Sequence, residues 1–271
     1  MKALLGGVLL MIAGVAQAAP GTVDKLWRLD CGSVQVNDLN LFSDTQSYAG
    51  QARRLVSSCY LIKDGDAYML WDTGLPLGAA SPVDPSKPMN VMPGRPIIEQ
   101  LAELGIKPEQ IGLIGISHHH FDHSGQAAAF PKAKLVIGAG DLAVARKNEA
   151  VGKPIAPWLI EGAKVEGVEG DKDLFGDGSV LMLDLRGHTP GNHGLLVRLA
   201  KTGVVLLSGD VAHFHENLDS DGVPTFNVDR ADSLSAMDRF RKLATSLKAV
   251  AIIQHDPRDV AKLPAFPQGA E

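Results

Sequence analysis

Several polar residues follow runs of β-branched and large apolar residues, and this regularity constrains the fold more than any other feature of the chain. Asp72, His118, His188, Asp210 and His255 each come at the end of such a run. Runs of this kind are typical of β-strands. Strand ends that gather at one edge of a sheet form a rigid platform for a functional site. The pattern therefore predicts buried sheets that present these side chains together.

The remaining elements fit a layered fold. Predicted strands include Leu55–Ile62, Ala67–Trp71, Ile111–Ile116, Lys134–Ile137, Val180–Leu185, Leu195–Leu199, Val204–Leu207 and Val250–Ile253. Helices are predicted at Pro96–Leu104, at Asp141–Asn148 and after the N-cap Asp229, where apolar residues recur at spacings of three or four. The stretch Leu75–Pro96, rich in Pro, Gly and Ser, is expected to be a long surface loop. Strands mixed with helices indicate an α/β architecture.

The N-terminus has the features of a signal peptide. Lys2 precedes an apolar stretch that ends in Ala16-Gln17-Ala18, a small-x-small cleavage pattern. Pro20-Gly21 interrupts the apolar run before the roughly 20 residues that a membrane anchor needs. We expect residues 1–18 to be cleaved and residues 19–271 to form a single domain in the periplasm or outside the cell, with no membrane contact.

Charge and cysteine content limit the partners and the compartment. The formal net charge is −5, and it becomes −6 when Lys2 leaves; no run of Lys or Arg offers a phosphate-binding surface. Nucleic acid is therefore not an expected partner. Cys31 and Cys59, the chain's two cysteines, fall on consecutive predicted strands. A disulfide between them fits an oxidising compartment, and two buried free thiols are the alternative.

The densest chemical signal lies in Ser117–Gly125, which contains the pattern His-x-His-x-Asp-His. In an extended backbone, His118 and His120 point to the same face, so both rings can bind one ion while His119 faces away. Asp122 and His123 follow after the chain turns and can bind a second ion. Imidazole and carboxylate ligands suit zinc and, less selectively, manganese, iron or cobalt.

This motif resembles the signature of the metallo-β-lactamase superfamily. Gly187–Gly191 resembles that superfamily's next ligand loop, Ser208-Gly209-Asp210 its bridging aspartate, and Gln254-His255-Asp256 its final histidine. Trp71–Gly74 resembles its early Asp-Thr-Gly turn. The resemblance implies an αβ/βα four-layer sandwich with a site for two metal ions on one edge.

The resemblance also assigns the ligands. It places His118, His120 and His188 on one zinc ion, Asp122, His123 and His255 on a second, and Asp210 between them. A hydroxide held between the ions is then the nucleophile, and Asp122 can return a proton to the leaving group. Asp72 is expected to hydrogen-bond to a ligand histidine, with capping of a turn as the alternative.

Within the superfamily, the chain is most similar to the N-acyl homoserine lactonase family. The similarity lies in Ser117–Gly125, in Gly187–Gly191 and in His255-Asp256-Pro257. It implies an enzyme that opens the lactone ring of N-acyl homoserine lactones, which are quorum-sensing signals, with a small-molecule lactone or ester as substrate. A phosphotriester or aryl-ester hydrolase is the second reading, and Asp210 argues against a β-lactamase. A metal-binding protein without catalysis is disfavoured because every ligand position is filled.

His213 is the main departure from the lactonase pattern, which commonly has tyrosine there. A histidine could also donate a hydrogen bond to an oxyanion, or it could pack under the loop.

The other polar and apolar candidates have less specific roles. His119, His193 and His215 are expected to be solvated or packing residues. Apolar loop residues could line an acyl pocket or belong to the core: Leu41, Phe42, Met89, Val91, Met92, Phe214 and Phe226. Acyl-chain preference and the oligomeric state, including a homodimer, stay open.

Overall fold

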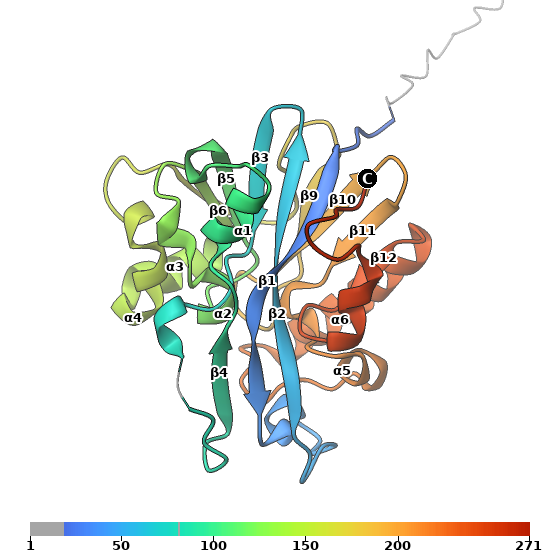
Figure 1. Cartoon of the computed structure of the whole chain (residues 1–271). Helices are drawn as coiled ribbons and strands as arrows, with labels where there is room; N and C mark the ends of the chain where they lie inside the picture. The colour runs from blue at the N-terminus through green and yellow to red at the C-terminus, as the bar shows by residue number, and fades with distance from the viewer. Residues whose placement is uncertain (1–18, 81) are drawn as a thin grey trace, which may run out of the picture.

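Two β-sheets pack face to face, with helices on the outer face of each (Figure 1). This computed structural model describes residues 19–80 and 82–271, so the predicted signal peptide lies outside the described residues. Within these residues, the first sheet has seven strands, in the order β4 (Met89–Pro93), β1 (Lys25–Val36), β2 (Arg53–Asp64), β3 (Ala67–Trp71), β5 (Ile111–Ile116), β6 (Lys134–Gly138) and β7 (Val165–Val168). The second has five, in the order β12 (Val250–Ile252), β11 (Gly203–Leu207), β10 (His193–Leu199), β9 (Val180–Asp184) and β8 (Lys172–Asp173).

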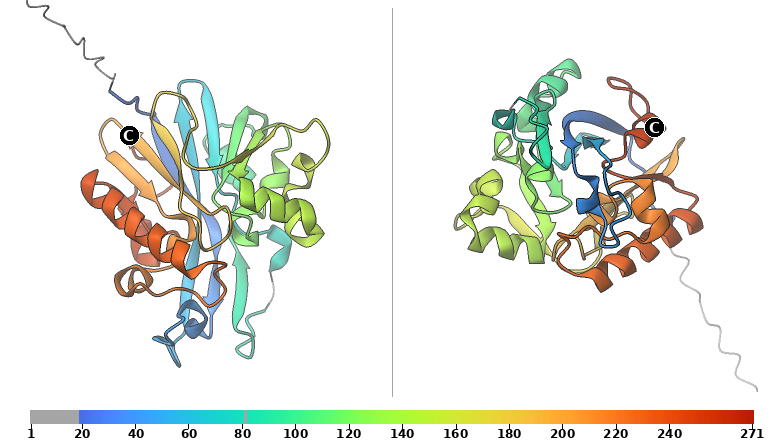
Figure 2. Two further views of the ribbon diagram at one scale, coloured as in Figure 1. Left: turned by 180° about the vertical axis from the view of Figure 1, so that it is seen from behind. Right: turned by 90° about the horizontal axis from the view of Figure 1, so that it is seen from below.

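Helices complete the four layers and confirm the predicted αβ/βα sandwich. On the side of the seven-stranded sheet lie α1 (Ile97–Glu103), α3 (Ala139–Lys147) and α4 (Glu149–Gly152), and on the side of the five-stranded sheet lie α5 (His215–Ser220) and α6 (Arg230–Ser246) (Figures 1 and 2). The short α2 (Phe121–Ser124) follows β5. Short 3₁₀ helices are η1 (Leu39–Phe42), η2 (Leu77–Ala79), η3 (Pro108–Gln110), η4 (Ala127–Ala129), η5 (Lys153–Trp158), η6 (Gly209–Val211) and η7 (Pro257–Lys262).

The predicted helices form where expected. The Asp229 side chain caps α6 by accepting a hydrogen bond of 2.8 Å from Asp232 N. Met237 and Phe240 from its apolar stripe are buried against Leu196 and Leu206 of the five-stranded sheet. Because an amphipathic helix gains most of its stability from burying such a stripe, the spacing alone was sufficient to predict it. No helix in the described part of the chain is long and apolar enough to span a membrane.

The prediction of one long loop over Leu75–Pro96 is wrong in part. This stretch contains η2 and the strand β4, which pairs antiparallel with β1 from Met89 to Pro93. An edge strand tolerates proline because one of its sides makes no ladder hydrogen bonds. The strand forms through its backbone pairing with β1, a tertiary contact that local composition does not reveal.

Two features tie the N-terminal strand to the rest of the molecule. Cys31 on β1 and Cys59 on β2 form a disulfide with a Cα separation of 5.8 Å, which confirms the predicted pairing. At the start of β1, Leu26 and Ala270 exchange backbone hydrogen bonds of 2.8 and 2.9 Å, and Lys25 forms an ion pair with Glu271. The described start of the chain and its C-terminus therefore lie side by side, at the top of Figure 1.

Candidate metal centre

The seven side chains predicted as metal ligands converge at one edge of the sandwich. His118 and His120 follow β5, and Asp122 and His123 belong to α2. His188, Asp210 and His255 follow strands of the five-stranded sheet. Both sheets therefore contribute to one site, as the strand-end pattern predicted.

His118, His120 and His188 form the first cluster. His120 Nδ1 lies 3.0 Å from His118 Nε2 and 3.0 Å from His188 Nε2. Asp210 Oδ2 lies 3.6 Å from His118 Nε2 and 3.4 Å from His188 Nε2. Tetrahedral zinc with Zn–N bonds near 2.0–2.1 Å requires ligand atoms roughly 3.3 Å apart. The spacing of these four side chains fits one such ion.

Asp122, His123 and His255 form the second cluster. His123 Nε2 and His255 Nε2 lie 3.3 Å apart, and Asp122 Oδ2 lies 3.8 and 3.7 Å from them. Asp210 Oδ1 lies 3.3 Å from His123 Nε2 and 3.0 Å from His255 Nε2. Asp210 thus directs one carboxylate oxygen toward each cluster, as a bridging ligand would.

The tautomers of the histidines also fit metal binding. His123 Nδ1 donates to Asp72 Oδ2 over 2.9 Å, His188 Nδ1 to Asn227 Oδ1 over 2.8 Å, and His255 Nδ1 to the Val56 carbonyl over 2.7 Å. With the proton on Nδ1, each ring turns the lone pair of Nε2 inward. Asp210 Oδ1 is buried and has no hydrogen-bond donor among residues 19–80 and 82–271. Such an acceptor-rich, buried set of atoms suits cations.

The pKa values of the histidines differ between the two clusters. Burial lowers the pKa of His120 and of His188 to about 3 and that of His118 well below its usual value, so the first cluster is neutral. Burial also opposes the charge on His123, but Asp210 and Asp72 raise its pKa well above the usual value. Neutral imidazoles are the form that binds metal, and cations at the site would displace the proton of His123.

Asp72 supports the second cluster, as predicted. Its Oδ1 accepts a hydrogen bond of 2.7 Å from Ser117 N, and its Oδ2 accepts one of 2.9 Å from Ser117 Oγ in addition to that from His123. Asp72 is fully buried and has a positive φ of 58°. An unfavourable backbone conformation is tolerated there because it aims the carboxylate at the ligand loop.

A second buried carboxylate, Asp141, was not predicted to belong to the site. Its Oδ2 accepts hydrogen bonds of 2.9 Å from His119 N and from Thr189 Oγ1, and its Oδ1 accepts one of 2.9 Å from Gly191 N. It therefore joins the two loops that carry the first cluster. In the sequence, Asp141 resembles an ordinary acidic residue in the first turn of a helix, so no local signal distinguished it.

The three histidines left without a site role have structural contacts. His119 Nδ1 lies 3.1 Å from Asp141 Oδ1, His193 Nδ1 donates to the Gly191 carbonyl over 2.7 Å, and His215 Nε2 lies 2.8 Å from Asp259 Oδ1. None of these three side chains belongs to the clusters of potential metal ligands, although the His119 ring packs edge-on against that of His120, with centroids 4.9 Å apart.

His213 is buried at the edge of the site. Its Nε2 lies 3.2 Å from Asp210 Oδ2, and its ring stacks on that of His255 with centroids 5.4 Å apart. Its Nδ1 has no hydrogen-bond partner in the described part of the chain. Asp210, His213 and His255 are close enough to hold one ion, but Asp210 and His255 already serve the pair of clusters.

A pocket with a volume of about 180 Å³ opens onto the two clusters. Its apolar lining comprises Val34, Val36, Phe42, Leu55, Met89, Phe121 and Phe226. Phe42, Met89 and Phe226 were among the candidate pocket residues, and the fully buried Phe214 instead packs against Tyr48 in the core. Phe121 is 46% exposed and Phe226 41%, so these rings offer apolar surface to an incoming molecule.

Comparison with known proteins agrees with this geometry. Residues 52–255 match the family model of the metallo-beta-lactamase superfamily. An N-acyl homoserine lactonase of Bacillus cereus is 27% identical over 255 residues, which cover 91% of this chain and 99% of that protein.

Two solved structures share the fold. An N-acyl homoserine lactone hydrolase with N-hexanoyl-L-homoserine bound at its catalytic metal centre has a TM-score of 0.79 at 24% identity, over 92% of this chain and 100% of that one. AidC, a dizinc quorum-quenching lactonase, has a TM-score of 0.69 at 18% identity, over 87% of this chain and 91% of that one. Together with the site geometry, these matches confirm the predicted resemblance: the chain belongs to the metallo-β-lactamase superfamily and is a metal-dependent hydrolase.

Proposed function

We propose that this hydrolase opens the lactone ring of N-acyl homoserine lactones at a centre of two zinc ions. The observation that carries the proposal is the apolar pocket above the two clusters, which combines a metal-dependent site with space for an acyl chain. Two of the similar proteins are an N-acyl homoserine lactonase and an N-acyl homoserine lactone hydrolase, which supports N-acyl homoserine lactones as the substrate class.

The chain's residues divide into roles around the reacting bond. His118, His120 and His188 would hold one zinc ion, Asp122, His123 and His255 the other, and Asp210 both. When bound, the ions would polarise the lactone carbonyl and lower the pKa of water to about 7. Water adds to the carbonyl carbon, the ring C–O bond breaks, and the product is the open N-acyl homoserine.

Two side chains would handle protons and charge. Asp122 lines the pocket and is partly exposed, so its carboxylate can take a proton from the attacking water and return it to the leaving alkoxide. His213 also lines the pocket, where a proton on Nε2 can be shared between Asp210 and the developing oxyanion.

An aryl-ester or phosphotriester hydrolase is the second candidate. The observation that favours it is the set of three phenylalanines in the pocket lining, Phe42, Phe121 and Phe226, since aromatic rings also stack on aryl groups. The acyl chain of a homoserine lactone would pack on the same rings.

Metal analysis and a substrate panel test the proposal. Purified protein should contain two zinc ions per chain and should cleave N-acyl homoserine lactones with a higher kcat/KM than aryl esters, phosphotriesters and β-lactams. A stable, active form with one metal ion would contradict the paired centre. Faster cleavage of phosphotriesters or aryl esters would favour the second candidate.

Export to the periplasm or the medium is part of the same proposal. It rests on the charged and apolar N-terminal segment, and the Cys31–Cys59 disulfide is compatible with an oxidising compartment. An intact mass corresponding to a chain that starts at Ala19 would support cleavage, and a retained Met1 in exported protein would contradict it.

A further inference from the structure

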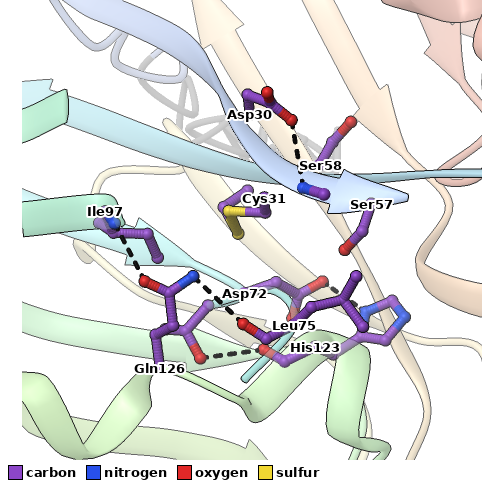
Figure 3. Close-up of a disulfide and its surroundings, with 12 residues drawn as sticks. Asp30, Cys31, Ser57, Ser58, Asp72, Leu75, Ile97, His123 and Gln126 are labelled. Atoms are coloured by element: carbon purple, nitrogen blue, oxygen red, sulfur yellow. Dashed lines mark hydrogen bonds and ion pairs between the residues drawn. A yellow bond between two sulfur atoms is a disulfide. The ribbon is translucent and has the colours of Figure 1, made fainter. Parts of the chain in front are cut away.

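The surroundings of the Cys31–Cys59 disulfide include Asp72 and Leu75, from one turn, and His123 (Figure 3). The disulfide is fully buried, and β1 and β2 pair beside it with a register shift between Asp30 and Ser33. That shift leaves one extra residue on β1, which is a β-bulge. The disulfide therefore cross-links the two strands at the place where their regular pairing is interrupted.

The cross-link is in contact with Gly74. A Cβ added at Gly74 would lie 2.3 Å from Cys31 Cβ, 2.9 Å from Cys31 Sγ and 3.0 Å from Cys59 Sγ. Gly74 also has a positive φ of 63°, which side chains disfavour. The 72–75 turn thus rests directly on the disulfide, with space for glycine and for nothing larger.

The other side of the same turn holds His123. Thr73 donates two hydrogen bonds to the His123 carbonyl, of 2.6 Å from its backbone N and 3.1 Å from Oγ1. Gly125 N donates to the Gly74 carbonyl over 2.8 Å, and Asp72 accepts from the His123 ring. Both the backbone and the ring of His123 are therefore fixed by the turn that the disulfide supports.

From these contacts we infer that the Cys31–Cys59 disulfide is a positioning element of the metal centre, which sets the zinc affinity of the second cluster through Gly74, Thr73 and His123. The inference rests on the proposed zinc centre. The first cluster is held mainly by Asp141 and Asn227. Its link to the 72–75 turn runs through Ser117, which Asp72 accepts from and whose Oγ lies 3.2 Å from His118 Nδ1. Because His123 contacts the turn directly and His118 only through Ser117, loss of the cross-link should weaken the second zinc site much more than the first.

Stepwise zinc titration of the full-length mature protein against a chromophoric chelator tests the inference. In the variant Cys31→Ala/Cys59→Ala, one zinc ion should bind with nearly the parent's affinity and the second about 10- to 100-fold more weakly, the range expected when a residue that orients a ligand is lost. Gly74→Ala, which keeps both cysteines but displaces the turn, should show the same selective loss.

A matched control separates positioning from general stability. Leu101→Ala removes apolar contacts from the core cluster that contains both cysteines, whereas Leu75 of the 72–75 turn belongs to a different cluster. Its unfolding temperature should fall while both zinc affinities stay at the parent's values. If the cysteine variant behaves like Leu101→Ala, or weakens both sites equally, the inference is overturned. If the parent itself binds no zinc, the proposed function fails instead.

Discussion

The first and second clusters of the metal centre differ in what holds their histidines. In the first, the buried Asp141 joins two loops by hydrogen bonds, and Asn227 orients His188. In the second, His123 is held through Asp72 and a turn that packs on a disulfide, and His255 donates to a carbonyl of β2. One half of the site therefore depends on contacts between loops, and the other is anchored to the β1–β2 part of the sheet. Similar ligands do not imply similar sensitivity to mutation.

The largest effect is expected at the residue that the two halves share. Asp210→Ser removes the carboxylate that faces both clusters, so two nearby cations would lose the negative charge between them. We expect metal content to fall and kcat/KM on lactones to drop more than about a thousandfold. Elemental analysis and steady-state kinetics measure both. Full activity in this variant would show that the two halves work without a bridge.

His213 tests whether the pocket edge contributes to catalysis independently of either half. His213→Ala should lower kcat on lactones about 100- to 1000-fold, as expected for loss of one oxyanion donor, while zinc content stays at two ions per chain. His213→Tyr should retain much of the activity because a phenol can donate in the same place. Unchanged kinetics in His213→Ala would leave the ring with a packing role on His255 and Phe42.

The two supporting carboxylates give the most direct comparison of the halves. Asp72→Asn should weaken the zinc affinity of the second cluster about 10- to 100-fold, and Asp141→Asn should weaken that of the first by a similar factor. In each variant an amide replaces an oxygen that accepts from the loops. Zinc titration of double variants identifies the affected site. In each of these, one ligand histidine of the other cluster is replaced by alanine as well, so that a single zinc site remains. Equal loss at both sites in either variant would contradict separate support.

The smallest effect concerns the surface beside His255. Burial would raise the pKa of Glu216, but Arg258 and Arg53 hold it at about 2, below the usual 4.5. A carboxylate with a depressed pKa stabilises the fold above its unfolded pKa, and this contribution is lost as the pH falls from about 4.5 toward 2. Glu216→Gln should cost about 0.2–1 kcal/mol at pH 7, because the pair is partly exposed and screened. Urea unfolding should show a smaller difference between parent and variant at pH 3 than at pH 7.

The sequence was most informative where chemistry is concentrated in a few adjacent residues. The His-x-His-x-Asp-His motif and the histidine or aspartate after several strands predicted which side chains would meet, because strand ends fix their positions. The α6 helix was predicted from its apolar spacing for a similar reason: the signal is local and periodic.

What the sequence did not reveal depends on contacts between distant segments. Asp141 belongs to the site only because Thr189 and Gly191 fold onto it, and Gly74 matters because Cys31 and Cys59 pack on it. The strand β4 depends on the free edge of β1. In each case the residue type is ordinary, and its role arises from a partner tens of residues away.

The pairing of Leu26 with Ala270 has a consequence for protein engineering. The described start of the chain and its C-terminus meet at one end of β1, whereas Val34 and Val36 at the other end line the pocket. At about 3.3 Å per residue, Lys25 and Val34 are roughly 30 Å apart along the strand. The two ends can therefore be joined by a short linker in a circular permutant, or attached to a solid support, while the mouth of the pocket stays open.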